Sequence, residues 1–192
     1  GMTVPTNNNF VIGDLDVLTG LKSDAATKYI DTNVAGTSLA QNDASASAYI
    51  TEPDTVNFGY YMSNGTNVSA GACLMLTASN QNYVFINGSS QQNTGTTIAN
   101  FNGMSRDNSS DFDYKDSVLT TYTNTSAAPI AAEIFLYARN SSGTPTQLSS
   151  ARFATYHFGP ALNLATLEGL QDTLITEVAE AQFSAEAANY FA

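Results

Sequence analysis

The sequence contains no tryptophan, one cysteine and one histidine among its 192 residues. Zinc and iron–sulfur sites need several cysteine or histidine ligands, which excludes both kinds of site here. A single cysteine also excludes an internal disulfide. Because Cys73 lies in the short apolar run GACLML, we expect it to be a small buried residue rather than a reactive thiol.

Basic residues are also scarce, since six Lys and Arg stand against seventeen Asp and Glu, a net charge of -11. Such a surface repels nucleic-acid phosphates and anionic lipids, so we predict neither as a partner. No apolar run approaches the roughly 20 residues of a membrane-spanning helix, which predicts no membrane insertion. The segment TVPTNNN does not resemble a signal peptide, and Gly1 before Met2 is typical of an expression scar. We expect a soluble protein with no export signal.

What the chain does have, up to about residue 160, is a series of short β-rich runs separated by clusters of Asn, Gly, Ser, Asp and Pro. Turn signals at this spacing are typical of an all-β sandwich, and a chain of this length forms a single domain in such folds. The predicted strands are residues 27–33, 45–50, 56–62, 72–78, 82–88, 117–123, 132–140 and 151–159.

The apolar spacing changes from Leu162 onward, where apolar residues recur at three- and four-residue steps. This pattern predicts one helix with a single apolar stripe that docks on the sandwich, and Asn163 is the predicted N-cap. The stripe consists of Leu164, Leu167, Leu170, Leu174 and Val178.

Several segments, in this order, resemble a known module. Residues 7–34 contain a Gly-Leu pair and the run TKYIDTN, and residues 133–181 contain the run ARN, a Ser/Gly/Pro loop, an alternating strand closing in Phe-Gly, and a Leu-spaced helix. Together they resemble the concanavalin A-like (laminin G-like) sandwich module of phage and prophage virion proteins; residues 40–51 and 100–112 match more loosely. The resemblance implies a concanavalin A-like jelly-roll β-sandwich with one C-terminal helix, set in a phage particle, and brings no catalytic residues.

The chain accordingly divides into three parts. Residues 1–8 are the scar and an N-terminal arm, residues 9–181 are the sandwich with its closing helix, and residues 182–192 are a helical or frayed extension. The extension carries Phe183, Tyr190 and Phe191, which a protruding helix would expose. We therefore expect an intermolecular contact there, and a homo-oligomer formed through the C-terminal helix; a frayed tail is the alternative.

His157 lies in the predicted strand ARFATYHFG, where alternation places it on one face with Phe153 and Thr155. A catalytic imidazole needs a nucleophile or substrate on one nitrogen and an orienting group on the other, and no G-x-S-x-G signature accompanies it. In the resembling family this position is an ordinary small polar residue. We interpret His157 as a partly buried strand residue and predict that it is dispensable for activity.

The densest charge is DFDYKD, with Asp111, Asp113 and Asp116. These carboxylates could bind Ca²⁺, which is the one possible cofactor, or Asp111 and Asp113 could act as acid and base. The same residues also suit a solvent-facing edge strand or the flank of a loop. Glycosidases on sandwich folds place paired carboxylates at near-alternate spacing, and no such run occurs; Glu52 and Glu133 are isolated in the sequence. We assign no catalytic residue, although carboxylates from distant strands could still form a glycoside hydrolase or lyase.

Aromatic rings that lie exposed on a sandwich can stack on sugars. The candidates for carbohydrate binding are Tyr60, Tyr61, Tyr83, Tyr114 and Tyr122. Tyr60 and Tyr61 are successive on one predicted strand, so one of them is expected outside, while the absence of tryptophan weakens the case. The resulting hypothesis is a non-catalytic virion module of a tail, fibre or capsid surface. It would be made in the bacterial cytoplasm and then act in the virion or outside the cell, binding a host surface glycan or neighbouring virion proteins.

Overall fold

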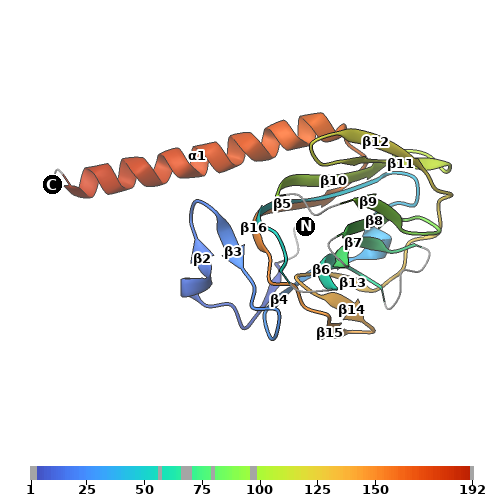
Figure 1. Ribbon diagram of the computed structural model, residues 1–192, viewed down its shortest axis with the longest axis horizontal. Helices are drawn as coiled ribbons and strands as arrows, with labels where there is room; N and C mark the ends of the chain where they lie inside the picture. The colour runs from blue at the N-terminus through green and yellow to red at the C-terminus, as the bar shows by residue number, and fades with distance from the viewer. Residues whose placement is uncertain (1–3, 56–57, 66–70, 79–80, 96–98, 191–192) are drawn as a thin grey trace.

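The computed structural model describes residues 4–55, 58–65, 71–78, 81–95 and 99–190. Within these ranges the chain forms two antiparallel sheets, a separate hairpin and one α-helix (Figure 1). The two sheets face each other across a shared apolar core, and helix α1 (Leu164–Tyr190) closes the chain. The predicted all-β sandwich with one C-terminal helix is confirmed.

Each sheet has seven strands in the part of the chain described. The first, sheet A, runs in the order β1 (Thr6–Asn8), β4 (Tyr29–Ala35), β13 (Glu133–Leu136), β6 (Gly59–Ser63), β7 (Cys73–Ala78), β8 (Gln81–Ile86) and β9 (Gln92–Gly95). The second, sheet B, runs β12 (Leu119–Thr123), β11 (Asp111–Lys115), β10 (Asn100–Arg106), β5 (Ala44–Glu52), β16 (Arg152–Gly159), β3 (Gly20–Lys22) and β2 (Leu15–Asp16). Strands β14 (Arg139–Ser141) and β15 (Thr144–Thr146) form the hairpin, and two short 3₁₀ turns cover Ile12–Asp14 and Gly36–Ser38.

Two boundaries differ from the predictions. Residues 6–8 pair with β4 and so belong to sheet A rather than to a free N-terminal arm. The segment 132–140 contains two strands, because the backbone at Tyr137 has a positive φ of 64° that separates β13 from β14. Strand β10 was missed, since the run NFNGMSR mixes Asn and Gly with its apolar residues.

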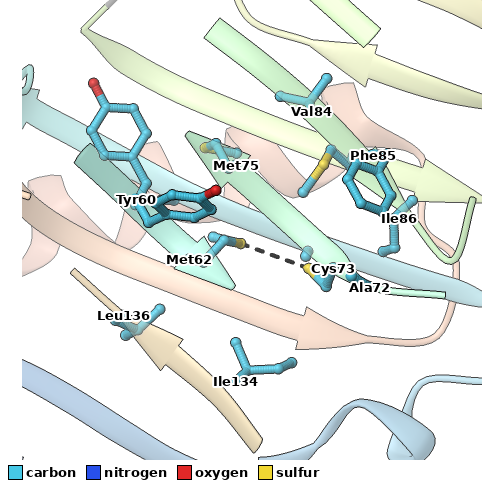
Figure 2. Close-up of a cluster of buried hydrophobic side chains, with 14 of the residues drawn as sticks. Tyr60, Met62, Ala72, Cys73, Met75, Val84, Phe85, Ile86, Ile134 and Leu136 are labelled. Carbon is cyan, nitrogen blue, oxygen red and sulfur yellow. Dashed lines mark hydrogen bonds between the residues drawn. The ribbon is translucent and has the colours of Figure 1, made fainter. Parts of the chain in front are cut away.

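Alternation along the strands builds the core between the sheets. On β5 the small residues Ala44, Ala46 and Ala48 are fully buried and face the core. Opposite them, larger side chains of sheet A interdigitate, as Figure 2 shows for the cluster from β6, β7, β8 and β13. Cys73 lies in this cluster with its Sγ 3.9 Å from Met62 Sδ. Burial raises the pKa of Cys73 to about 12, so the predicted buried, unreactive residue is confirmed.

A buried arginine joins the two sheets at one end. Arg106, at the end of β10, is fully buried. Its Nε donates to Ile86 O of β8 at 2.8 Å, and its Nη1 donates to Asp111 O and Asn124 O, each at 2.9 Å. Burial lowers the pKa of Arg106 and the nearby charge of Asp111 opposes that shift. The guanidinium therefore satisfies carbonyls from both sheets at once.

Replacing Arg106 with Met is expected to destabilise the fold by about 3–5 kcal/mol, because three buried carbonyls lose their charged donor. The matched control is Arg139→Met, since Arg139 is half-buried and water can replace its contacts; it should cost about 1 kcal/mol or less. Urea unfolding of the three proteins measures the difference. Equal costs for the two variants would contradict the role given to Arg106.

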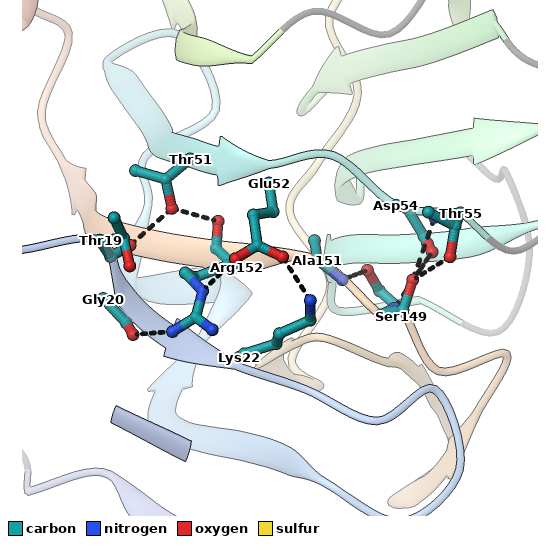
Figure 3. A network of polar contacts seen from close by, with 11 residues as sticks. Thr19, Gly20, Lys22, Thr51, Glu52, Asp54, Thr55, Ser149, Ala151 and Arg152 are labelled. Carbon is teal, nitrogen blue, oxygen red and sulfur yellow. Dashed lines mark hydrogen bonds and ion pairs between the residues drawn. The ribbon is translucent and has the colours of Figure 1, made fainter. Parts of the chain in front are cut away.

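Within sheet B, a polar network fixes the hairpin of β2 and β3 to β5 and β16 (Figure 3). The carboxylate of Glu52 on β5 bridges Lys22 of β3 and Arg152 of β16, with Arg152 Nε at 2.6 Å. Arg152 Nη1 also donates to Gly20 O at 2.8 Å. A Cβ on Gly20 would lie 1.9 Å from Phe153 O, so only glycine allows β3 this close to β16.

Helix α1 begins as the sequence predicts, because Asn163 Oδ1 accepts from Thr166 N at 3.0 Å in an N-cap. Its first turns pack on the outer face of sheet B, where Leu164 and Leu167 are buried against Phe101. Gly103 makes room for this contact, since a Cβ there would lie 2.4 Å from the Phe101 ring.

The prediction that the whole apolar stripe docks on the sandwich is wrong. Leu170, Leu174 and Val178 are 61%, 49% and 41% exposed. Leu170 lies at the margin of the side that contacts sheet B, and the helix has passed the sheet before it reaches Leu174 and Val178 (Figure 1). The helix is regular to Tyr190, so the C-terminal extension is helical rather than frayed up to that residue. Phe191 and the side chains of Phe183 and Tyr190 lie outside the described residues. In the described chain, no helix combines the length and the apolar character that crossing a membrane requires.

Candidate functional site

Three of the five candidate tyrosines are core residues. Tyr60, Tyr61 and Tyr114 are 5%, 0% and 2% exposed, which corrects their assignment to a sugar-binding surface. Tyr60 and Tyr61 are both buried because a β-bulge between Tyr60 and Met62 interrupts the alternation of β6. Tyr114 donates to Asn102 Oδ1 at 2.7 Å. None of the three rings offers a face on which a sugar could stack.

The other two tyrosines are half-buried and lie on different sheets. Tyr83 of β8 donates to Gln81 Oε1 at 3.2 Å. Tyr122 of β12 stacks on Phe112 with the ring centroids 5.7 Å apart. The structure therefore does not join the candidates into one aromatic floor, and carbohydrate binding by Tyr83 or Tyr122 stays a prediction.

The acidic segment lies on β11, which pairs with β10 on one side and β12 on the other. The alternative of an edge strand is therefore wrong, because β12 is the edge. The alternative of a loop flank describes two of the residues, since Asp111 begins β11 and Asp116 follows its last residue. Asp111 accepts from Asn108 Nδ2 at 2.6 Å, Asp113 from Thr121 Oγ1 at 2.6 Å, and Asp116 from the backbone of Val118 at 3.0 Å. Among the described residues no group of three acidic, histidine or cysteine side chains could hold a metal ion. The geometry gives the predicted Ca²⁺ site no support.

Metal removal tests this reading of the acidic segment. Because the three carboxylates already accept hydrogen bonds from separate neighbours, treatment with EDTA should leave the thermal midpoint unchanged. A Ca²⁺ site at 100 times its dissociation constant would add about 2.7 kcal/mol of stability. A midpoint that falls with EDTA and returns with Ca²⁺ but not Mg²⁺ would show that the site exists.

His157 contacts a serine on the neighbouring strand, as a catalytic pair would. Its Nε2 lies 3.0 Å from Ser45 Oγ, and that hydroxyl donates to Pro160 O at 2.6 Å. Because the hydroxyl has only one proton, Nε2 must carry a hydrogen and donate it to Ser45. The nitrogen that faces Ser45 is therefore not a base. Instead, His157 and Ser45 fix the backbone at Pro160, in the segment between β16 and α1. Burial lowers the pKa of His157.

A pH series tests this role. The folded protein holds His157 neutral below its ordinary pKa of 6.5, whereas the unfolded chain takes up a proton there. The contribution of His157 to the free energy of unfolding is therefore complete above pH 6.5. It is lost as the pH falls through the lowered pKa of the folded protein. His157→Gln should cost about 1–2 kcal/mol at neutral pH and flatten this part of the profile. Identical pH profiles of unfolding for both proteins would contradict it.

One carboxyl pair was not found from the sequence. Glu133 and Asp31 are about a hundred residues apart, yet β13 pairs with β4 and brings them together. The negative charge of Asp31, then the hydrogen bond between the two groups, raises the pKa of Glu133. Only the strand order, which no local pattern contains, could have revealed this pair.

Polar contacts seat the first half of α1 on sheet B. Glu168 pairs with Lys115 of β11 at 2.7 Å, and Gln171 Nε2 donates to Ser47 Oγ of β5 at 3.1 Å. Burial, then the nearby carboxylate of Asp172, raises the pKa of Tyr49 on β5. We call the part of α1 that contacts sheet B, Leu164 to Asp172, the seat of the helix. The rest of α1 extends beyond it.

Beyond the seat, α1 passes the tip of the β2–β3 hairpin and leaves an apolar groove of about 130 Å³ between them. We call its apolar side chains and the adjoining Leu170 the helix–hairpin surface, which comprises Val17, Leu18, Leu170, Leu174, Ile175 and Val178. Val17 and Leu18 are each 52% exposed. They occupy a turn, where polar residues are usual, and this is the signal by which the sequence could have indicated the surface.

Comparisons with known proteins find no matching family model and no matching curated protein. Among solved structures, tailspike protein 2 of Escherichia coli O157:H7 bacteriophage CAB120 is similar at a TM-score of 0.48 and 10% sequence identity. The similarity covers 84% of this chain and 25% of that one, so the chain spans about a quarter of its length. A likeness of this size assigns neither a family nor a function.

Proposed function

We propose that the chain is a non-catalytic module of a phage or prophage virion that attaches to neighbouring protein through the helix–hairpin surface. The observation that carries this proposal is the apolar side of α1 and of the hairpin turn, which the described part of the chain leaves exposed. Contiguous exposed apolar surface marks contact sites in proteins that are otherwise soluble. The virion setting rests on the resemblance of residues 7–34 and 133–181 to concanavalin A-like modules.

Attachment to protein fits the geometry better than attachment to a glycan. A sugar site in a sandwich needs an exposed ring together with polar groups around it. Tyr60, Tyr61 and Tyr114 are buried, and the two half-buried tyrosines lie on different sheets. The helix–hairpin surface, by contrast, presents six apolar side chains on adjoining elements.

The arrangement of the carboxylates supports a non-catalytic role. Retaining glycosidases hold their two carboxyl groups about 5–5.5 Å apart and inverting ones about 6.5–9.5 Å apart. Asp31 and Glu133 lie on the neighbouring strands β4 and β13, and the charge of Asp31 raises the pKa of Glu133. Glu52 is engaged by Lys22 and Arg152.

Purified particles from an induced host that carries the gene test the proposal. The protein should be a stoichiometric component by mass spectrometry, and antibodies against it should label one region of the particle by electron microscopy. The purified protein should leave host surface polysaccharides uncleaved. Absence from particles, or polysaccharide cleavage by the purified protein, would overturn the proposal.

A further inference from the structure

We infer that the helix–hairpin surface is covered by helix α1 of a second copy of this chain. The inference rests on the attachment role proposed above and names the occupant of the same surface. It follows from the position of the apolar stripe, the charges beside it and the length of helix that lies beyond the seat.

The exposed stripe has the form of a helix-pairing surface. Leu170, Leu174, Val178 and Ala181 follow at steps of four, four and three residues, which places them on one side of α1. All four side chains are exposed. The stripe continues from the buried Leu167 along the same side of the helix, but there the helix has passed the edge of sheet B, which leaves these side chains exposed (Figure 1). A second helix is the element whose shape fits such a stripe.

The hairpin provides the second wall of the site. Val17 and Leu18 line the groove together with Ile175 and Val178, and Ala154 and Thr155 of β16 form its floor. The network around Glu52 fixes this hairpin to sheet B. The hairpin wall of the groove is thus held in place before any partner binds, which lowers the entropy that binding loses.

The charge pattern favours an identical helix over a foreign one. Beside the stripe the one charged residue is Glu177, while Asp172 and Glu180 lie on other sides of the helix. Charges that flank an apolar stripe are what select a different partner in helix pairs. All six basic residues of the chain engage groups within it, in the ion pairs of Lys22, Lys28, Lys115 and Arg152 and the hydrogen bonds of Arg106 and Arg139. Two copies of the stripe can therefore meet with few charges in the contact.

The length of the helix gives the same answer. From Leu170 to Tyr190 it extends about 30 Å, and a single helix of that length is marginal in water without packing. In a symmetric pair each stripe covers the other, so both helices gain the packing that stabilises them.

The test measures the mass of the full-length protein in solution by light scattering. Wild type should have at least twice the mass of one chain, and Leu174→Glu/Val178→Glu should have the mass of one chain. The matched control is Thr173→Glu/Thr176→Glu, which adds the same charge at exposed positions off the stripe and should keep the wild-type mass. A monomeric wild type, or equal masses for the two double variants, overturns the inference.

A mixing experiment distinguishes stripe-to-stripe pairing from contact elsewhere. Leu174→Lys/Val178→Lys should be monomeric alone, and an equimolar mixture of the Lys and Glu variants should recover the multimeric mass. A mixture that stays monomeric contradicts pairing between the two helices. Circular dichroism checks that each variant keeps the wild-type fold.

The two proposals fail in different ways. A wild type that is monomeric in solution but present in particles removes the second copy and leaves the virion role. A wild type that is multimeric and absent from particles leaves the paired helices and removes the virion role.

Discussion

The sandwich depends on one buried positive charge. Arg106 donates to carbonyls at the end of β8, on β11 and after β12, and so fixes where two sheets meet that have no disulfide between them. A guanidinium can do this because its donors diverge in one plane, whereas an apolar residue would leave each carbonyl without a partner. Arg106 Nη2 also donates to Asn124 Oδ1 at 3.2 Å, and a Cβ on Gly88 would lie 2.2 Å from that oxygen, so glycine is required beside it.

The other basic residues are also used in contacts within the chain. Lys115 is used to seat the helix, and Lys22 and Arg152 are used to hold the hairpin. Several of the other carboxylates accept hydrogen bonds from hydroxyl or backbone groups instead, as Asp24, Asp43 and Asp113 do. Because the basic residues are engaged within the chain, association with another protein through apolar contacts needs no basic surface here.

Local patterns predicted the sandwich, the N-cap at Asn163 and the burial of Cys73, because each depends on spacing within a few residues. They failed where the outcome depended on distant elements. Alternation could not reveal the bulge that buries Tyr61 beside Tyr60, nor the strand order that brings Asp31 to Glu133. The apolar spacing of α1 correctly predicted one face of a helix. It could not predict where that face stops contacting the sheet, because the spacing of residues along a helix gives no information on the width of the sheet beneath it.

The buried thiol of Cys73 has a practical and a biological consequence. With its pKa raised to about 12 and its sulfur enclosed by Met62 and the core of sheet A, the side chain exchanges with neither glutathione nor external disulfides. The fold is thus indifferent to the redox state of its surroundings, and it can pass from a reducing interior to an oxidising exterior without rearranging a covalent bond. It also means that a cysteine introduced at any surface position would carry a fluorophore or spin label alone, with the native residue left in place.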